Sequence, residues 1–384
     1  MAVPVRVHVV PTVLAWAAGR SGRGLDELIA QFPRLTEWEA GSSQPTLKQL
    51  ERFARATSTP VGALLLPEPP EDRLPVPDFR TIRDARVSTP SPNLLETVYL
   101  CEQRQEWYHD FARANGQSAL EFVGSVGLST DPSHAAGAMQ ATLRFEPSVR
   151  ARYSAWTDAL RGLLSRAEDA GVLVMVSGVV GSNTHRKLEV EEFRGFALTD
   201  QFAPLVFING SDTKAAQIFT LAHELAHVWL GESAVSSAGL GERPANNIER
   251  WCNQVAAELL VPLRSLREEI IADEPLPDTL ARLARLYKVS TLVVLRRLID
   301  VGRLSWDDYR IAFNDELERV QQQRAQASGG DFYNTQPVRV SKRFARAVIA
   351  DTLEGRTLYR DAFSLLGIRK PATFDELSQR LGVT

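Results

Sequence analysis

The feature that most constrains this chain is a His-Glu-Leu-Ala-His segment inside a long run of helix-compatible residues. Residues 213–230 contain no glycine or proline, follow the turn-forming segment Asn209–Asp212 and end at Gly231, so they predict one helix. Two histidines four positions apart lie on the same face of a helix, about one turn apart. His223 and His227 can therefore bind one metal ion, and neutral imidazoles suit zinc.

Glu224 lies beside the two histidines and is offset toward the same opening. A carboxylate next to a zinc site can take a proton from water, because zinc lowers the pKa of a bound water to about 7. This pattern predicts hydrolysis with Glu224 as the general base. The alternative is a pair of histidines that only complete helix packing. Because the chain has only six histidines, this spacing is rare by chance, and the zinc interpretation is favoured.

A catalytic zinc ion needs a third protein ligand and one open coordination position. Our candidate is Glu249, which begins a predicted helix at about residues 245–260. Asn253 lies on the same face of that helix and could orient one of the ligand imidazoles. Glu258, farther along the helix, is the alternative ligand, and Glu242 lies in a glycine-rich loop.

Two segments together resemble the ImmA/IrrE family of metallopeptidases: LAHELAHVWLGES, which contains the two histidines, and IERWCNQVAAELLVP, which contains Glu249. The resemblance covers roughly residues 170–300. It implies a zincin-like (gluzincin) peptidase fold with Zn²⁺ as cofactor, and regulatory proteolysis, typically of helix-turn-helix repressors. His223, His227 and Glu249 match the family's zinc ligands, and Glu224 matches its general base.

The chain departs from the gluzincin pattern at two neighbouring positions. Cys252 stands where that pattern has Ala, and Asn253 stands where it has Asp. Both differences are small and should leave the site intact. Cys252 as a fourth ligand would close the open coordination position, so we expect it to pack as a small apolar residue.

Peptide cleavage also requires that the substrate backbone is held beside the metal. The predicted strand before the zinc helix is a candidate edge for pairing with a substrate, and a plain core strand is an equal alternative. Its residues are Leu205, Val206, Phe207, Ile208 and Asn209. An oxyanion donor is needed as well, and Tyr153, His185 and Tyr287 are residue types that could supply one. The sequence contains nothing that selects among these three.

Changes in periodicity predict a predominantly helical α+β fold with a small sheet. The β-branched run 172–180 and residues 193–198 and 205–209 predict strands, and most of the remainder is helical. We expect seven segments: an XRE-like helix-turn-helix module (1–68), a proline-rich connector (69–93), a helical region (94–169), the zinc metallopeptidase domain (170–270), a helical, helix-turn-helix-like extension (271–320), a linker (321–336) and a C-terminal helical module (337–384).

The N-terminal module resembles an XRE-type helix-turn-helix through LTEWEAGSSQPTLKQLERFA. The stretch between Leu28 and Gly41 is, however, about four residues shorter than the second and recognition helices of such a motif require. Residues 1–70 carry seven basic and six acidic side chains, whereas a phosphate-binding face has a clearer basic excess. DNA binding and protein interaction are therefore equal alternatives here. A second basic segment, around Lys342–Arg346, predicts a solvated face or a contact with nucleic acid or an acidic partner.

Composition narrows the class of protein further. The 384 residues carry 44 basic and 47 acidic side chains, a net charge of -3, which gives no overall preference for nucleic acid or membranes. Two isolated cysteines favour a reducing cytoplasm, and no apolar run is long enough to span a membrane. We expect a soluble cytoplasmic endopeptidase with a repressor-like protein substrate, with DNA as a second partner. The alternative is a transcriptional regulator or antitoxin-like partner of a toxin, with a non-catalytic metal site.

Overall fold

The computed structural model describes residues 5–21, 23–71, 73–79, 81–82, 85–86, 90–236, 246–324 and 338–383. The chain forms two compact units. The first consists of Met1–Pro75 with Val87–Val98, and the second of Val76–Arg86 with Tyr99–Thr384. Glu242, one of the alternative ligands considered from the sequence, lies outside the described residues.

The first unit is a small helical bundle around Trp38, Phe53 and Leu14, which are buried. Its third helix has only five residues, and Leu35 and Trp38 on it face the core. The XRE-type assignment of this unit remains a prediction. Its helices are α1 (Pro11–Arg20), α2 (Leu25–Gln31), α3 (Leu35–Glu39), α4 (Leu47–Ala56) and the 3-10 turn η1 (Ala63–Leu65).

The second unit is organised around a four-stranded mixed sheet with the order β3-β5-β4-β6. Its strands are β3 (Leu173–Ser177), β4 (Gly195–Leu198), β5 (Leu205–Asn209) and β6 (Ala234–Ser236). β3 and β5 are parallel, whereas β4 is antiparallel to both β5 and β6. Two shorter strands, β1 (Thr81–Ile82) and β2 (Ala85–Arg86), form a separate antiparallel pair.

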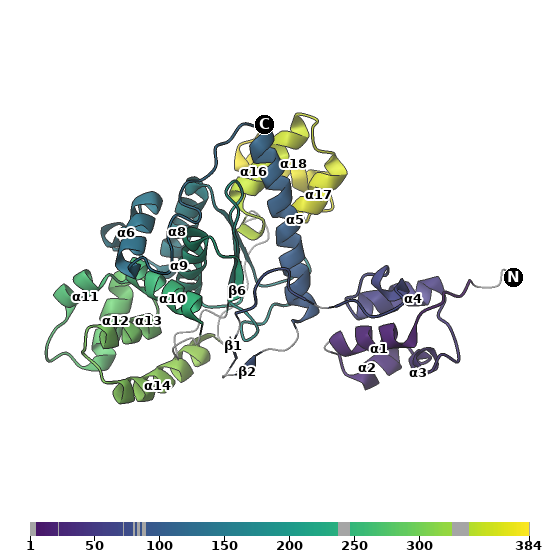
Figure 1. Cartoon of the computed structure of the whole chain (residues 1–384), viewed down its shortest axis with the longest axis horizontal. Helices are drawn as coiled ribbons and strands as arrows, with labels where there is room; N and C mark the ends of the chain where they lie inside the picture. The colour runs from purple at the N-terminus through teal and green to yellow at the C-terminus, as the bar shows by residue number, and fades with distance from the viewer. Residues whose placement is uncertain are drawn as a thin grey trace. The chain divides into compact units, whose positions relative to one another are not determined.

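Helices cover both faces of this sheet, which is why β4 and β5 are buried along their whole length. α8 and α9 pack against one face, and α5 and α16 lie against the other (Figure 1). The remaining helices extend from this core. The helices are α5 (Pro92–Ala114), α6 (Pro132–Leu143), α7 (Pro147–Arg150), α8 (Trp156–Ala170), α9 (Lys214–Leu230), α10 (Asn247–Leu260), α11 (Leu263–Glu269), α12 (Leu276–Tyr287), α13 (Thr291–Asp300), α14 (Trp306–Arg324), α16 (Lys342–Leu353), α17 (Tyr359–Leu366) and α18 (Pro371–Leu381).

The predicted fold class, a mainly helical α+β chain with a small sheet, is confirmed. β5 has the predicted bounds, while β3 and β4 are shorter than the runs that predicted them. α14 continues to Arg324, four residues into the segment expected to be a linker. No helix among the described residues is long and apolar enough to cross a membrane.

The C-terminal helices are fixed to the rest of the second unit by polar contacts. The carboxylate of Glu168 on α8 accepts hydrogen bonds from Ser341 Oγ (2.6 Å) and from the backbone N–H of Lys342 (2.7 Å), at the start of α16. Arg343 donates to the hydroxyl of Tyr108 (2.8 Å), and Arg346 donates to the carbonyl of Leu381 (3.2 Å). Two of the basic residues predicted to face solvent or a partner therefore make internal contacts.

Candidate metal centre

Helix α9 carries the His-Glu-Leu-Ala-His segment through the middle of the core. The hydroxyl of Thr213 caps the helix by accepting the backbone N–H of Ala216 (3.2 Å), and Gly231 ends it in the left-handed conformation. Between these ends, residues 217–229 are buried all round. His223 and His227 have no exposed surface. Two histidines in such a position require polar partners, because an unpaired polar group in an apolar core is unfavourable.

The partner comes from helix α10, which packs along α9. Asn246 caps α10 by accepting the backbone N–H of Ile248 (2.8 Å), so that the helix begins immediately before Glu249. Glu249 lies in the first turn and is buried, with 4% of its surface exposed. A carboxylate at a helix N-terminus is also favoured by the helix dipole.

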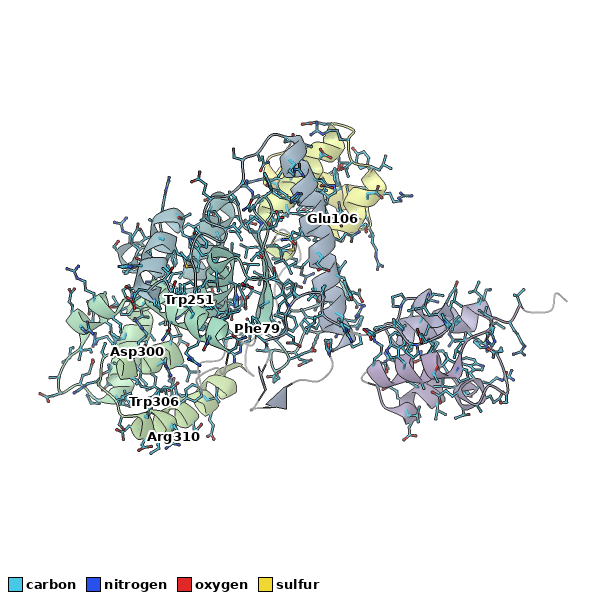
Figure 2. The ribbon with its side chains drawn as sticks, viewed as in Figure 1. Phe79, Glu106, Trp251, Asp300, Trp306 and Arg310 are labelled. Carbon is cyan, nitrogen blue, oxygen red and sulfur yellow. The ribbon has the colours of Figure 1, made fainter. Side chains whose placement is uncertain are left out.

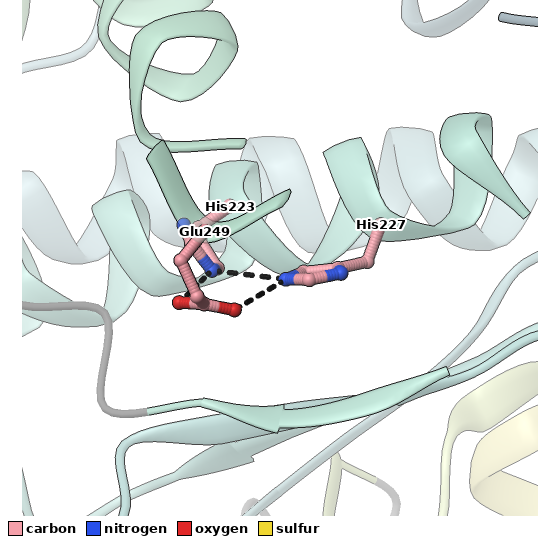
Figure 3. A group of neighbouring side chains, drawn as sticks. All are labelled: His223, His227 and Glu249. Carbon is pink, nitrogen blue, oxygen red and sulfur yellow. Dashed lines mark hydrogen bonds and ion pairs between the residues drawn. The ribbon is translucent and has the colours of Figure 1, made fainter. Parts of the chain in front are cut away.

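His223, His227 and Glu249 converge on one point between the two helices (Figure 3). Glu249 Oε1 lies 3.0 Å from His227 Nε2, and Glu249 Oε2 lies 3.3 Å from His223 Nε2. The two Nε2 atoms are 3.2 Å apart. One potential ligand atom from each residue lies within 4.8 Å of the others. Two imidazole nitrogens and one carboxylate oxygen in a buried site are a donor set that suits zinc.

Asn253 fixes the tautomer of His223. Its amide oxygen lies 3.0 Å from His223 Nδ1, one turn along α10 from Glu249. Because a carbonyl oxygen only accepts, Nδ1 carries the proton and donates it, which leaves the lone pair on Nε2 directed at the cluster. Hydrogen bonds of this kind orient metal-binding histidines in proteins.

Glu224 lies against the sheet. Its Oε1 accepts a hydrogen bond from the hydroxyl of Ser236 on β6, while its Oε2 is buried and has no hydrogen-bond partner among the described residues. Gly195 on β4 makes room for this carboxylate, since a Cβ there would lie 2.8 Å from Glu224 Oε1. A buried, unpartnered carboxylate oxygen beside a metal-binding cluster fits an additional ligand such as water.

Burial and mutual charge set the pKa values in the cluster. Burial raises the pKa of Glu224 to about 8. Burial also opposes ionisation of Glu249, but the charges and hydrogen bonds of His223 and His227 together outweigh it and hold the pKa of Glu249 at about 2. Burial opposes protonation of His223, but Glu249, Glu224 and the hydrogen bond to Asn253 together outweigh it and raise the pKa of His223, whereas burial lowers the pKa of His227. Glu249 is therefore ionised and Glu224 has a high proton affinity.

Two other residues that the sequence analysis considered as ligands have different surroundings. Glu258 pairs with the guanidinium of Arg297 and accepts the backbone N–H of Leu263 (3.2 Å), so it is engaged at the other end of α10. Cys252 is fully buried in the hydrophobic core, and burial raises its pKa well above the usual range for a thiol. Its sulfur is not among the ligand atoms that gather at the cluster in the described part of the chain.

The predicted substrate-pairing role of β5 is wrong. β5 lies inside the sheet, with β3 on one side and β4 on the other, so both of its backbone edges are occupied. Leu205–Asn209 form the core strand that the sequence left as the alternative. Two of the three residues suggested as oxyanion donors contact other parts of the structure. The Tyr287 hydroxyl hydrogen-bonds Ser265 (2.8 Å), and the Tyr153 ring packs against Gly162.

Sequence reasoning missed two residues that touch the cluster. Ser236, which hydrogen-bonds Glu224, lies on a three-residue strand too short to give a detectable alternation. Phe79 lies in the proline-rich connector, and its ring faces the imidazole of His227, with centroids 6.4 Å apart and planes inclined by 30°. Both residues reach the site through pairing between distant segments, which local patterns do not report.

Comparison with known proteins agrees with this geometry. Residues 167–299 match a peptidase family described as the IrrE N-terminal-like domain. Residues 340–380 match a family described as a domain of unknown function. Neither family match includes the helices of the first unit. The cluster of His223, His227 and Glu249 lies within the first of these matches, so the chain contains an IrrE-like metallopeptidase domain with a candidate metal site.

A relative is the radiation response metalloprotease IrrE of Deinococcus radiodurans, which is 35% identical over 101 residues. The aligned part is 25% of this chain and 31% of that protein. The chain thus spans about a third of the length of this relative.

Proposed function

We propose that the chain is a zinc-dependent endopeptidase that performs regulatory cleavage of a protein partner. The observation that carries this proposal is the pairing of two different features in one buried site. One is a two-histidine, one-carboxylate cluster, and the other is an adjacent carboxylate with an unpartnered oxygen. A purely structural zinc site usually has four protein ligands and needs no base beside it.

In the proposed reaction, His223, His227 and Glu249 would hold the zinc ion. Bound there, zinc would supply a Lewis acid that polarises a peptide carbonyl and acidifies water. Glu224 takes the proton from the attacking water as the C–O bond forms, and delivers it to the amine as the C–N bond breaks. The Ser236 hydroxyl holds Oε1, so Oε2 is the oxygen that exchanges the proton.

The regulatory role and the repressor-like substrate are supported by similarity. The matched relative is described as a radiation response metalloprotease, and the resemblance to the ImmA/IrrE family implies cleavage of helix-turn-helix repressors. A peptidase with so narrow a role needs a partner-recognition surface in addition to its catalytic site. The N-terminal unit is our candidate for that surface.

The test compares the full chain with its Glu224→Gln variant in the cells from which the chain comes. New protein N-termini are identified by N-terminal labelling and mass spectrometry, and the inactive variant is used to capture the uncleaved partner. We expect a few new N-termini with the native chain and none with Glu224→Gln, because the amide cannot accept the proton. Zinc content should be equal in both. Zinc binding with identical N-termini in both samples would instead support a regulator or antitoxin-like protein with a non-catalytic metal site.

A further inference from the structure

Three residues of the proline-rich connector, Pro77–Phe79, form an additional strand on the sheet. The backbone N–H of Phe79 donates to the carbonyl of Val235 (2.9 Å), and the N–H of Val235 donates to the carbonyl of Pro77 (3.0 Å). Asp78 and Val235 are thereby paired in a parallel bridge. We call Pro77–Phe79 the connector strand. It belongs to the second unit, together with the sheet and the metal cluster.

The connector strand lies along the edge of the sheet that contacts the candidate metal centre. β6 is the outer strand of the four-stranded sheet, and its residue Ser236 hydrogen-bonds the proposed base Glu224. The side chain of Phe79 (Figure 2) is half-buried and stacks over His227. Backbone pairing with β6 and ring contact with a proposed zinc ligand thus occur at the same segment.

A peptide that enters this site as an extended chain would meet the β6 edge, whose Ser236 contacts the proposed base Glu224. Binding by strand addition uses backbone hydrogen bonds for affinity and alternate side chains for selectivity. At Val235, the connector strand already uses both the N–H and the C=O. Its Phe79 also covers one face of the His227 ring. Another peptide cannot make these contacts until the connector strand leaves.

The attachment of the connector strand is suited to reversible release. Pro75 and Pro77 have no N–H, so the pairing cannot extend toward the N-terminus as a regular ladder. Pro75, Pro77 and Asp78 are exposed, and Phe79 is only half-buried. A structural strand of a core is normally longer and buried on at least one face.

We propose that the β6 edge is the peptide-binding site of the proposed peptidase, that it accepts an extended segment with an aromatic side chain against His227, and that the connector strand occupies it as a built-in competitor. This inference rests on the proposed function, since it identifies how the substrate of that same site binds and how access is controlled. In the structure, the connector strand is the segment bound at this edge.

The test measures binding of a fluorescent synthetic peptide with the sequence of residues 74–82 to the zinc-loaded full chain. The Glu224→Gln variant serves as the background, so that binding is measured without cleavage. Phe79→Pro removes both the donor N–H and the ring, and Phe79→Ala removes only the ring. Glu71→Gln is the matched control, because it changes an exposed connector residue outside the paired segment and leaves the prolines in place.

We expect the peptide to bind the Phe79→Pro chain about 10- to 1000-fold more tightly than the parent chain, as when an open state populated at about 10 to 0.1% becomes the dominant one. The affinity of Phe79→Ala should lie between those of Phe79→Pro and the parent, and Glu71→Gln should equal the parent. Amide hydrogen exchange at Val235 should accelerate in Phe79→Pro and slow again when the peptide binds. Far-UV circular dichroism and thermal melting check that each variant is folded.

Equal peptide affinity in the parent and in both Phe79 variants would overturn the inference, as would unchanged exchange at Val235. Peptide binding that does not protect Val235 would place the binding site elsewhere and also overturn it. Cleavage between residues 74 and 82 in the chain with native Glu224 would make the connector a substrate rather than a competitor. None of the binding measurements depends on catalysis, so a failed peptidase assay and a failed competition assay are distinguishable.

Discussion

His223, His227 and Glu249 are buried together although each carries a polar or charged group. Such a cluster is unfavourable in a core unless its members satisfy one another or bind an ion. The side chains converge from two helices, and each offers one atom to a common point. At this scale the structure therefore makes a prediction about metal content.

The purified chain should contain about one zinc ion, and His223→Ala, His227→Ala and Glu249→Ala should each lose most of it, because three protein ligands hold the ion. Cys252→Ala is the matched control, since this residue is buried on the same helix as Glu249. It should retain zinc. Inductively coupled plasma mass spectrometry gives the metal content. Zinc loss in Cys252→Ala would make the thiol a ligand, and full retention in Glu249→Ala would exclude the carboxylate.

Gly195 leaves space for the Glu224 carboxylate because it has no side chain. A Cβ at this position would lie 2.8 Å from Glu224 Oε1, 2.7 Å from Thr220 Cγ2 and 2.9 Å from the Phe207 carbonyl. These neighbours belong to a buried helix and a central strand, so they have little room to move.

Gly195→Ala should lower the free energy of unfolding by about 1–3 kcal/mol through overpacking and should reduce peptidase activity by displacing Glu224. The control is Gly137→Ala on the exposed face of α6, where an added Cβ meets nothing within 4 Å. That variant should be stabilised by about 0.5–1 kcal/mol, since alanine favours the helix. Denaturant unfolding compares the two. Equal stability of Gly195→Ala and the parent would show that the sheet can yield at this point.

At the scale of elements, the contact between α8 and α16 depends on a half-buried carboxylate. Glu168 accepts hydrogen bonds from Ser341 and Lys342 at the start of α16. Burial raises its pKa above the usual range despite these hydrogen bonds. As pH rises through the ordinary value of about 4.3, the unfolded chain loses this proton before the folded chain does. The contribution of Glu168 to stability must therefore fall as pH rises through this window.

Glu168→Gln removes this titration. Relative to the parent, the stability of the variant should improve between about pH 4.3 and neutral pH, because only the parent must ionise a half-buried carboxyl whose pKa is raised. The hydrogen bonds from Ser341 and Lys342 both go to Oε1, and the amide oxygen of glutamine can still accept them. Unfolding free energies at several pH values give the difference between the two proteins. A difference that stays constant with pH would mean that Glu168 titrates normally in the folded chain.

Local patterns in the sequence predicted most of the helices and strands whose formation depends on neighbouring residues. The caps and uninterrupted composition of α9 defined that helix, and the β-branched residues of β5 defined that strand. The spacing of Glu249 and Asn253 placed both on one face of α10, from which Asn253 reaches His223. The order of the strands was not predictable in this way. It depends on pairing between distant segments, and for that reason β5 was taken for an edge and β6 was missed.

At the scale of the whole molecule, the charges of the N-terminal unit limit its capacity to bind DNA. Its basic residues Arg23 and Arg34 form ion pairs with Glu27 and Glu37. Its third helix has five residues, two of which are buried, so little of it can enter a major groove.

We therefore expect the full chain to bind DNA weakly and without sequence preference. In gel-shift and footprinting experiments, any complex seen at about 50 mM salt should largely disappear at about 150 mM, where non-specific phosphate contacts are weakened. A discrete footprint with nanomolar affinity at the higher salt would instead make this unit an operator-binding domain. Loss of partner cleavage on deletion of the unit would support its role in substrate docking.

The connector strand also determines the concentration that a free peptide needs in order to compete for the β6 edge. Phe79 belongs to the same chain and the same unit as β6, and a competitor within one chain can act at an effective concentration of about 1 mM. A free peptide of equal affinity at about 1 µM would be outnumbered roughly a thousandfold at the β6 edge. A partner that first docks elsewhere on the chain becomes tethered too and competes on equal terms. The peptidase would then select its substrates mainly by which proteins dock on it. The sequence around the cleaved bond would matter little.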